Sequence, residues 1–519
     1  MVSSRSCDWF ELGAVRRDLR GRSVRGGLYS SLSQGGQFLL HLGTTAIIAR
    51  LLKPSDFGLV AMVLSIARFA DQFRDLGLAQ ATIQERDLQP TQVSAVFWIN
   101  TAVGFLLTLI VAAAAPAISA FYNEPRLLAV GMALSGGFLL SGLNVQHQAL
   151  LQRQMLFGRL AAADLSATAL SSAIGTAGAF AGWGCWSLVT MSLSFYLFRT
   201  LALRAACPWT PGPPRRAAGV RKMIHLGLGI SGFNMLNYFS RNLDQVLIGR
   251  LFGTAPLGIY SRAYQLLLFP LTQLRTPIMN VGMPALASLR QDPERYRRYY
   301  ARIVFLLAAA SMPAVAVLMV GAGDIVTILL GTQWRGVDSL FRIMGWAALG
   351  QPAITAMRGL PLLSLGRGRH YFQFGVVSAA LTVAGFVVGV RWGVNGIAWS
   401  YVISFYATAI LTVRWCLRGS PLRLSDALAP LQWPMLAALV CGIAAWGARS
   451  ATERWMQTGH AAPTLEEAVI RLSIAAIAAG AAGAVLWKLS PDTYQLKRGG
   501  WRTWLQAARP NVGAGGPIA

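Results

Sequence analysis

Long apolar runs with few charges recur along the whole chain, separated by short polar breaks. A helix needs roughly 20 mainly apolar residues to cross the hydrocarbon core of a bilayer, and about fourteen runs approach this length. They include residues 28–50, 92–119, 256–289 and 467–487. No connection between runs is long enough for a domain outside the membrane. The pattern therefore predicts an all-α polytopic membrane protein with about 14 transmembrane helices.

Composition and the distribution of charge add an orientation to this prediction. The chain is 54% hydrophobic and 13% charged, whereas soluble domains carry about a quarter charged residues. With the N-terminus placed in the cytoplasm, 30 of the 46 basic residues fall in inner connections and adjoining helix ends, and nine in outer ones. This bias predicts that both termini are cytoplasmic. The net charge of +26 is therefore a membrane-topology signal, and no nucleic-acid partner is expected.

A short pattern recurs at an offset of 200 residues. It consists of Arg50-Leu51 before Phe57-Gly58, and of Arg250-Leu251 before Leu257-Gly258. Six predicted spans separate the two copies, so both copies insert in the same orientation. Such parallel repeats are related by a pseudo-two-fold axis along the membrane normal, and the substrate site of such transporters lies between the repeats.

The repeat and the proline-rich basic stretch after the sixth span define the expected organisation. The segments are a cytoplasmic N-terminal segment 1–27, an N-lobe 28–204, a cytoplasmic linker 205–222, a C-lobe 223–413, two further helices in 414–488 and a cytoplasmic tail 489–519. The N-terminal segment is polar and lacks the apolar core of a signal peptide.

Polar residues at helical spacing follow one face of the first helix of each half. The stripes contain Gln34, Gln37 and His41 in the first half, and Asn234, Asn237 and Arg241 in the second. These positions also differ by 200 residues. Inside a membrane, such stripes face a hydrated cavity or bond one helix to another. We favour the cavity, because the stripes are long and contain ionisable residues.

Further charged residues lie within predicted spans, where an unpaired charge is costly. Arg68, Arg275 and Arg358 are candidates for the substrate cavity, because a guanidinium stays charged and binds phosphate with two parallel hydrogen bonds. Candidate ion-coupling groups are Asp71, Asp75, Asp164 and Asp244. Structural ion pairs are the alternative for the closely spaced charges.

The motifs of enzymes and of cofactor sites are missing from the sequence. Five scattered cysteines form no CxxC pair, and the chain contains no HExxH, P-loop or GxSxG motif. We therefore predict no catalytic residues, no metal site and no cofactor.

Several segments together resemble a known family. They are residues 49–59, 75–78, 151–157, 241–244 and 258–260. The chain resembles the Wzx-type polysaccharide flippases, in particular the WzxC-like group, within the multidrug/oligosaccharidyl-lipid/polysaccharide exporter superfamily. The resemblance implies two six-helix lobes with two extra helices, and alternating access in the bacterial inner membrane. It also implies transfer of undecaprenyl-diphosphate-linked repeat units for exopolysaccharide, capsule or O-antigen synthesis. The implied partners are this lipid-linked oligosaccharide, membrane lipids, and the polysaccharide polymerase and export machinery.

Two other functions compete with this one. A multidrug or small-molecule exporter of the same superfamily should show an acidic cavity, whereas the interior charges here are mainly arginines. A membrane glycosyltransferase or polymerase needs a sizeable catalytic loop or domain. The longest outer connection, 449–466, offers Glu453, His460 and Glu466 but little room.

Overall fold

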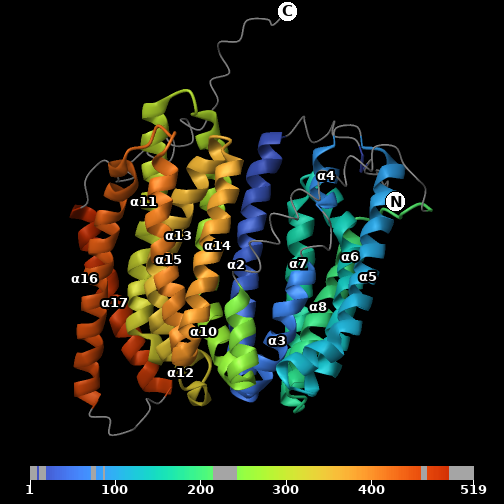
Figure 1. The fold of residues 1–519 in the computed structure, drawn as a ribbon, viewed down its shortest axis with the longest axis horizontal. Coiled ribbons are helices and arrows are strands. Elements are labelled where there is room, and N and C mark those ends of the chain that lie inside the picture. The colour runs from blue at the N-terminus through green and yellow to red at the C-terminus, as the bar shows by residue number, and fades with distance from the viewer. Residues whose placement is uncertain are drawn as a thin grey trace, which may run out of the picture. The chain divides into compact units, whose positions relative to one another are not determined.

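The computed structural model describes six stretches of the chain, and their regular structure is helical. These stretches are residues 9–10, 19–71, 77–85, 88–213, 242–456 and 465–489. Figure 1 shows the labelled helices. The chain divides into two compact units. Unit 1 comprises Met1–Ser261 and Leu329–Trp334, and unit 2 comprises Arg262–Ile328 and Arg335–Ala519.

Unit 1 is a helical bundle. Its helices are α2 (Leu19–Leu51), α3 (Pro54–Asp71), α4 (Leu78–Gln84), α5 (Pro90–Tyr122), α6 (Arg126–Arg153), α7 (Phe157–Phe180) and α8 (Cys185–Ala206). Pro54 and Pro90 occupy first helical positions, where the missing N–H costs no helical hydrogen bond. Asn123, in the left-handed conformation, ends α5. Helix α5 packs on α6, α7 on α8, and α2 on α7 (Figure 1).

The start of the predicted linker 205–222 packs against unit 1. Trp209 is buried there in a cluster with Phe97. The indole of Trp98 donates to the carbonyl oxygen of Gly212 at 2.8 Å. The remainder of the predicted linker lies outside the described residues.

Helix α2 begins at Leu19, well before residue 28, where the apolar run starts. An apolar run measures the hydrocarbon thickness, whereas a helix can continue beyond it through polar residues. The predicted boundary of the N-terminal segment is therefore not the start of the helix. Residues 1–8 and 11–18 lie outside the described part of the chain.

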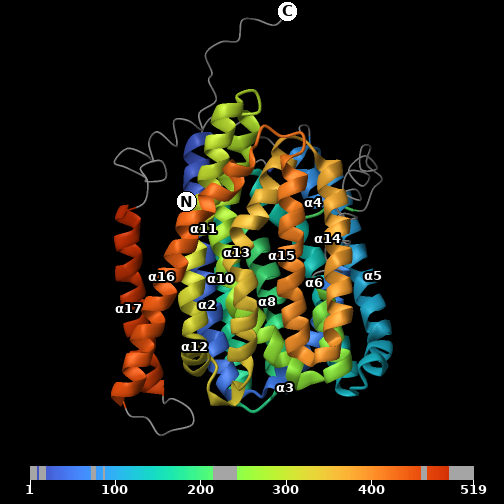
Figure 2. The same cartoon turned by 60° about the vertical axis from the view of Figure 1, so that its left-hand side comes forward.

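Unit 2 is also a helical bundle. Its first helix, α10 (Thr254–Ser288), begins in unit 1 and continues into unit 2. Its other helices are α11 (Pro293–Val320), α12 (Ala322–Leu329), α13 (Val337–Ser364), α14 (Gly368–Gly389), α15 (Gly393–Leu417), α16 (Leu424–Met456) and α17 (Leu465–Leu489). Helix α16 packs on both α11 and α17, and α15 packs on α13 and α14 (Figure 2). Helices α16 and α17 correspond to the two helices predicted outside the repeat.

Seven helical segments of the described chain are long and apolar enough to cross a membrane. They are Pro90–Tyr122, Arg126–Arg153, Cys185–Ala206, Pro293–Val320, Gly368–Leu417, Leu424–Trp455 and Leu465–Ala484. The fifth of these contains both α14 and α15. The structure thus confirms an all-α, multi-helix membrane protein, whereas the count of about fourteen spans stays a prediction.

Four further helices are long enough to span a membrane but are less apolar than these seven segments. Helices α2, α7, α10 and α13 contain 33, 24, 35 and 28 residues, and a rise of about 1.5 Å per residue makes each long enough to cross about 30 Å of hydrocarbon. Helices this polar need protein or water, not lipid, on part of their surface.

Candidate functional site

The predicted polar stripe of the first half lies on α2. Gln34 and Gln37 each donate to a serine hydroxyl one turn earlier, at 3.3 and 3.0 Å. Ser33 in turn donates to the carbonyl oxygen of Ala161 on α7 at 3.3 Å. The side chain of His41 is exposed. The stripe residues Gln34 and Gln37 therefore bond within α2, Ser33 connects α2 to α7, and His41 is accessible.

One basic and one acidic candidate lie on the last turn of α3. Arg68 is exposed, and Asp71 is partly buried. The remaining stripe and α3 candidates, Asn234, Asn237, Arg241 and Asp75, lie outside the described residues.

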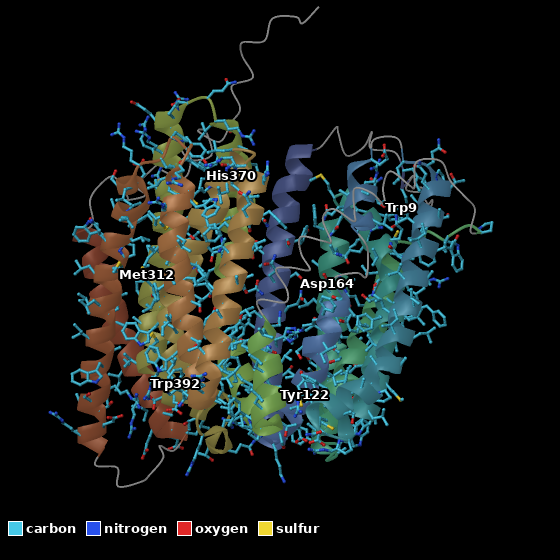
Figure 3. All side chains as sticks on the ribbon, viewed as in Figure 1. Trp9, Tyr122, Asp164, Met312, His370 and Trp392 are labelled. Atoms are coloured by element: carbon cyan, nitrogen blue, oxygen red, sulfur yellow. The ribbon has the colours of Figure 1, made fainter. Side chains whose placement is uncertain are left out.

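A charged pair lies between α7 and α8 in unit 1. The Nε of Arg199 is 2.7 Å from Oδ1 of Asp164, and its Nη2 donates to Oε1 of Gln148 on α6 at 3.1 Å. Figure 3 shows Asp164 near mid-length of the bundle. The exposed residues Leu197 and Leu201 lie on the opposite side of α8 from Arg199, because two positions along a helix differ by about 200°. The pair therefore faces the interior of the bundle.

This pair gives Asp164 a counter-ion within the chain. The arginine balances the carboxylate without a mobile cation in the state described here, and the ion-coupling role of Asp164 stays a prediction. Arg199 is not among the residues predicted from the sequence, because it lies near the end of a predicted span. The sequence signal that could have indicated this pair is an acidic residue in one apolar run and a basic residue in the next.

Asp244 is fully buried and bonded to neutral donors in unit 1. The hydroxyl of Tyr260 donates to its Oδ2 at 2.7 Å, and the backbone N–H of Gln245 donates to its Oδ1 at 2.8 Å. Arg241, the basic residue three positions before Asp244, lies outside the described residues.

The repeat-related glycines Gly58 and Gly258 meet in unit 1. A Cβ added at Gly58 would overlap the carbonyl oxygen of Thr254, and a Cβ added at Gly258 would overlap that of Pro54. Pro54 and Thr254 are themselves 200 residues apart. The contact is thus reciprocal, as a two-fold relation requires. This reciprocity supports the repeat, and it explains why both positions are glycine.

Arg358 on α13 is held by aromatic rings within unit 2. Its guanidinium carbon lies 5.0 Å from the ring centroid of Phe374 on α14, within the range of a cation–π contact. Trp415 on α15 packs edge-on against the same ring at 5.9 Å. A guanidinium in such a contact can still donate hydrogen bonds from its N–H groups. Arg275, another predicted phosphate-binding residue, is partly buried on α10.

A network of charges connects the C-terminal helices to the rest of unit 2. Arg449 Nε lies 3.2 Å from Oδ2 of Asp324 and 3.1 Å from Oε1 of Glu453, and Nη1 donates to the carbonyl oxygen of Val320 at 2.7 Å. Arg471 Nη1 is 3.6 Å from Oε1 of Glu453. Burial raises the pKa of Asp324. Glu453 thus belongs to an ionic network rather than to a catalytic loop.

Residues 47–338 match the family described as "Polysaccharide biosynthesis protein", more than half of the chain. The chain belongs to this family. Among curated relatives, the lipopolysaccharide biosynthesis protein WzxC of Escherichia coli is 23% identical over 409 residues, covering 76% of this chain and 80% of that protein. The succinoglycan biosynthesis transport protein ExoT of Rhizobium meliloti is 25% identical over 423 residues, covering 80% and 84%.

Solved structures agree on the fold of this family member. The lipid II flippase MurJ in an inward closed conformation has a TM-score of 0.66 at 10% identity, covering 90% of this chain and 99% of that one. An inward-facing multidrug resistance transporter of the MATE family and MOP superfamily has a TM-score of 0.54 at 15% identity, covering 78% and 95%. The chain is therefore a Wzx-like membrane transporter of polysaccharide biosynthesis and not an enzyme.

Proposed function

We propose that this transporter moves undecaprenyl-diphosphate-linked oligosaccharide repeat units across the bacterial inner membrane by alternating access, with both termini in the cytoplasm. The family match over residues 47–338 carries the proposal. Relatives named for lipopolysaccharide, teichuronic acid and succinoglycan biosynthesis support it, because they serve different polymers. A lipid carrier bearing a sugar chain is the kind of substrate that such polymers share.

The chemistry of the candidate residues suits this substrate. A diphosphate needs cationic donors, which Arg275 and Arg358 supply on helices α10 and α13. Both helices are too polar for full contact with lipid, so part of their surface suits a hydrated substrate path. We assign diphosphate binding to these arginines, and we retain Gln34, Gln37, His41 and Arg68 as further cavity residues.

Reconstitution of the purified protein tests this function. A fluorescent undecaprenyl-diphosphate oligosaccharide is placed in the vesicle membrane. In proteoliposomes, this lipid should become accessible to a membrane-impermeant quencher faster than in protein-free vesicles. Arg358→Ala should slow this transfer severalfold, because the guanidinium makes charge-assisted hydrogen bonds to phosphate. Export of a cationic dye without transfer of the lipid would instead identify a drug exporter.

A further inference from the structure

Helix α10 carries an exposed face of uncharged polar residues near its middle. Gln265, Thr272, Thr276 and Asn280 are all exposed, and their spacing of seven, four and four residues places them along one side. Thr272 lies next to the midpoint of Thr254–Ser288. Hydroxyl and amide groups at this depth are unfavourable against acyl chains. This face therefore suits water or a polar ligand better than lipid.

Prolines add backbone acceptors to the same region. Pro277 and Pro284 have no N–H, so the carbonyl groups of Gln273 and Asn280, four residues earlier, lose their helical donors. The Thr276 hydroxyl donates to the carbonyl oxygen of Thr272 at 2.8 Å, which leaves its own oxygen able to accept. The face thus offers acceptors as well as amide donors.

Tyr264, which precedes Gln265 on α10, is in contact with a group of side chains from two other helices of unit 2. Tyr264, next to Gln265 on α10, packs edge-on against Tyr401 of α15 with ring centroids 6.2 Å apart. Gln351 of α13 donates to the Tyr401 hydroxyl at 3.2 Å. Tyrosine combines a flat apolar surface with a polar hydroxyl, and side-chain amides both donate and accept.

We propose that this α10 face, with Tyr264, Gln351 and Tyr401, binds the glycan of the substrate. Neutral donors and acceptors beside aromatic rings complement sugar hydroxyls and the apolar faces of sugar rings, whereas a diphosphate would require charge. Arg275 lies on the same helix between Thr272 and Thr276, close in sequence to the polar face. The diphosphate joins the lipid directly to the first sugar, so a guanidinium beside a neutral face matches this junction. The inference rests on the proposed flippase function.

Two lipid probes separate this inference from the function on which it rests. The first is the lipid-linked repeat unit purified from the bacterium that encodes this chain, and the second is undecaprenyl diphosphate without sugar. Wild-type protein in nanodiscs should bind the first about tenfold more tightly than the second. The double variant Thr272→Val, Thr276→Val keeps the side-chain shape but removes both hydroxyls, and should bind the two lipids with similar affinity.

Matched variants keep this test independent of folding. Thr382→Val on α14 removes a hydroxyl that donates to its own helix, at Ser378, and should leave the preference for the glycosylated lipid unchanged. Gln351→Leu is a second variant that should lose the preference for the glycosylated lipid, and it replaces the double variant if the double variant fails to fold. A preference that survives both variants, or equal wild-type binding of the two lipids, overturns the glycan face and leaves the flippase proposal intact. No wild-type binding of either lipid overturns both.

Discussion

The Asp164–Arg199 pair of unit 1 and the Arg449 network of unit 2 use the same chemistry in different places. The first joins three helices near the middle of a bundle, through one carboxylate and one amide. The second joins helix ends, and Arg449 contacts two carboxylates and a backbone carbonyl. The first pair has a single acid, whereas the second group combines a fully buried aspartate with an exposed glutamate and has several basic partners.

The difference teaches that the depth and the number of partners, not the ion pair itself, decide what a charge contributes. A charge left without its one partner retains its full desolvation cost, whereas a buried charge in a network, such as Asp324, still has other opposite charges nearby when one partner is removed. We therefore expect the same arginine-to-apolar change to have different effects in the two regions.

The largest expected effect is from Arg199→Leu. Removing one partner of a buried pair costs about 3–5 kcal/mol, and the residual exposure of 16% and 22% for the two side chains places this case near the lower limit. We expect a lower midpoint of thermal unfolding in detergent and a smaller yield of monodisperse protein.

The double variant Arg199→Leu, Asp164→Leu is the control for this prediction. Replacing both charges with apolar groups removes the desolvation cost, so most of the lost stability should return. A double variant no more stable than the single one would show that the pair is needed for packing rather than for charge balance.

A moderate effect is expected from Arg449→Met. This change leaves the buried Asp324 without its arginine, but Arg471 still contacts Glu453, so we expect a loss of about 1–2 kcal/mol. Hydrogen exchange should increase in α16 and α17 more than in α14 and α15, because the network holds the C-terminal pair. Arg454→Met, an exposed position five residues later, should change neither measurement. A loss as large as that of Arg199→Leu would remove the contrast between the two regions.

The contrast between these regions also marks what the sequence could and could not predict. Apolar runs predicted helices such as α5 and α10 to within a few residues, because hydropathy records contact with lipid or core. The repeat offset pairs Gly58 with Gly258, and the structure places these two glycines in contact. Arg199 was missed, because its pairing with Asp164 depends on how two helices pack. The burial of Trp209 in a proline-rich segment was missed for the same reason.

The smallest effect is expected from Asp324→Asn, and its pH dependence separates desolvation from pairing. Burial raises the pKa of Asp324 above its unfolded value, with Arg449 opposing the shift. The folded state therefore binds this proton more tightly than the unfolded state does. Protonation of Asp324 adds stability that is fully present below the ordinary aspartate pKa of about 3.9. This stability is lost as the pH rises through the raised pKa of the folded state.

Asparagine cannot titrate, so unfolding midpoints measured across this range should show the wild type gaining stability relative to Asp324→Asn on acidification. At neutral pH the free energies of unfolding of the two proteins should differ by less than about 1 kcal/mol. The amide removes a buried charge, and Arg449 retains its contacts with Glu453 and with the carbonyl oxygen of Val320. If the wild type instead loses stability relative to Asp324→Asn on acidification, attraction to Arg449 outweighs burial. The network would then stabilise unit 2 as the mid-bundle pair stabilises unit 1, and depth alone would not distinguish them.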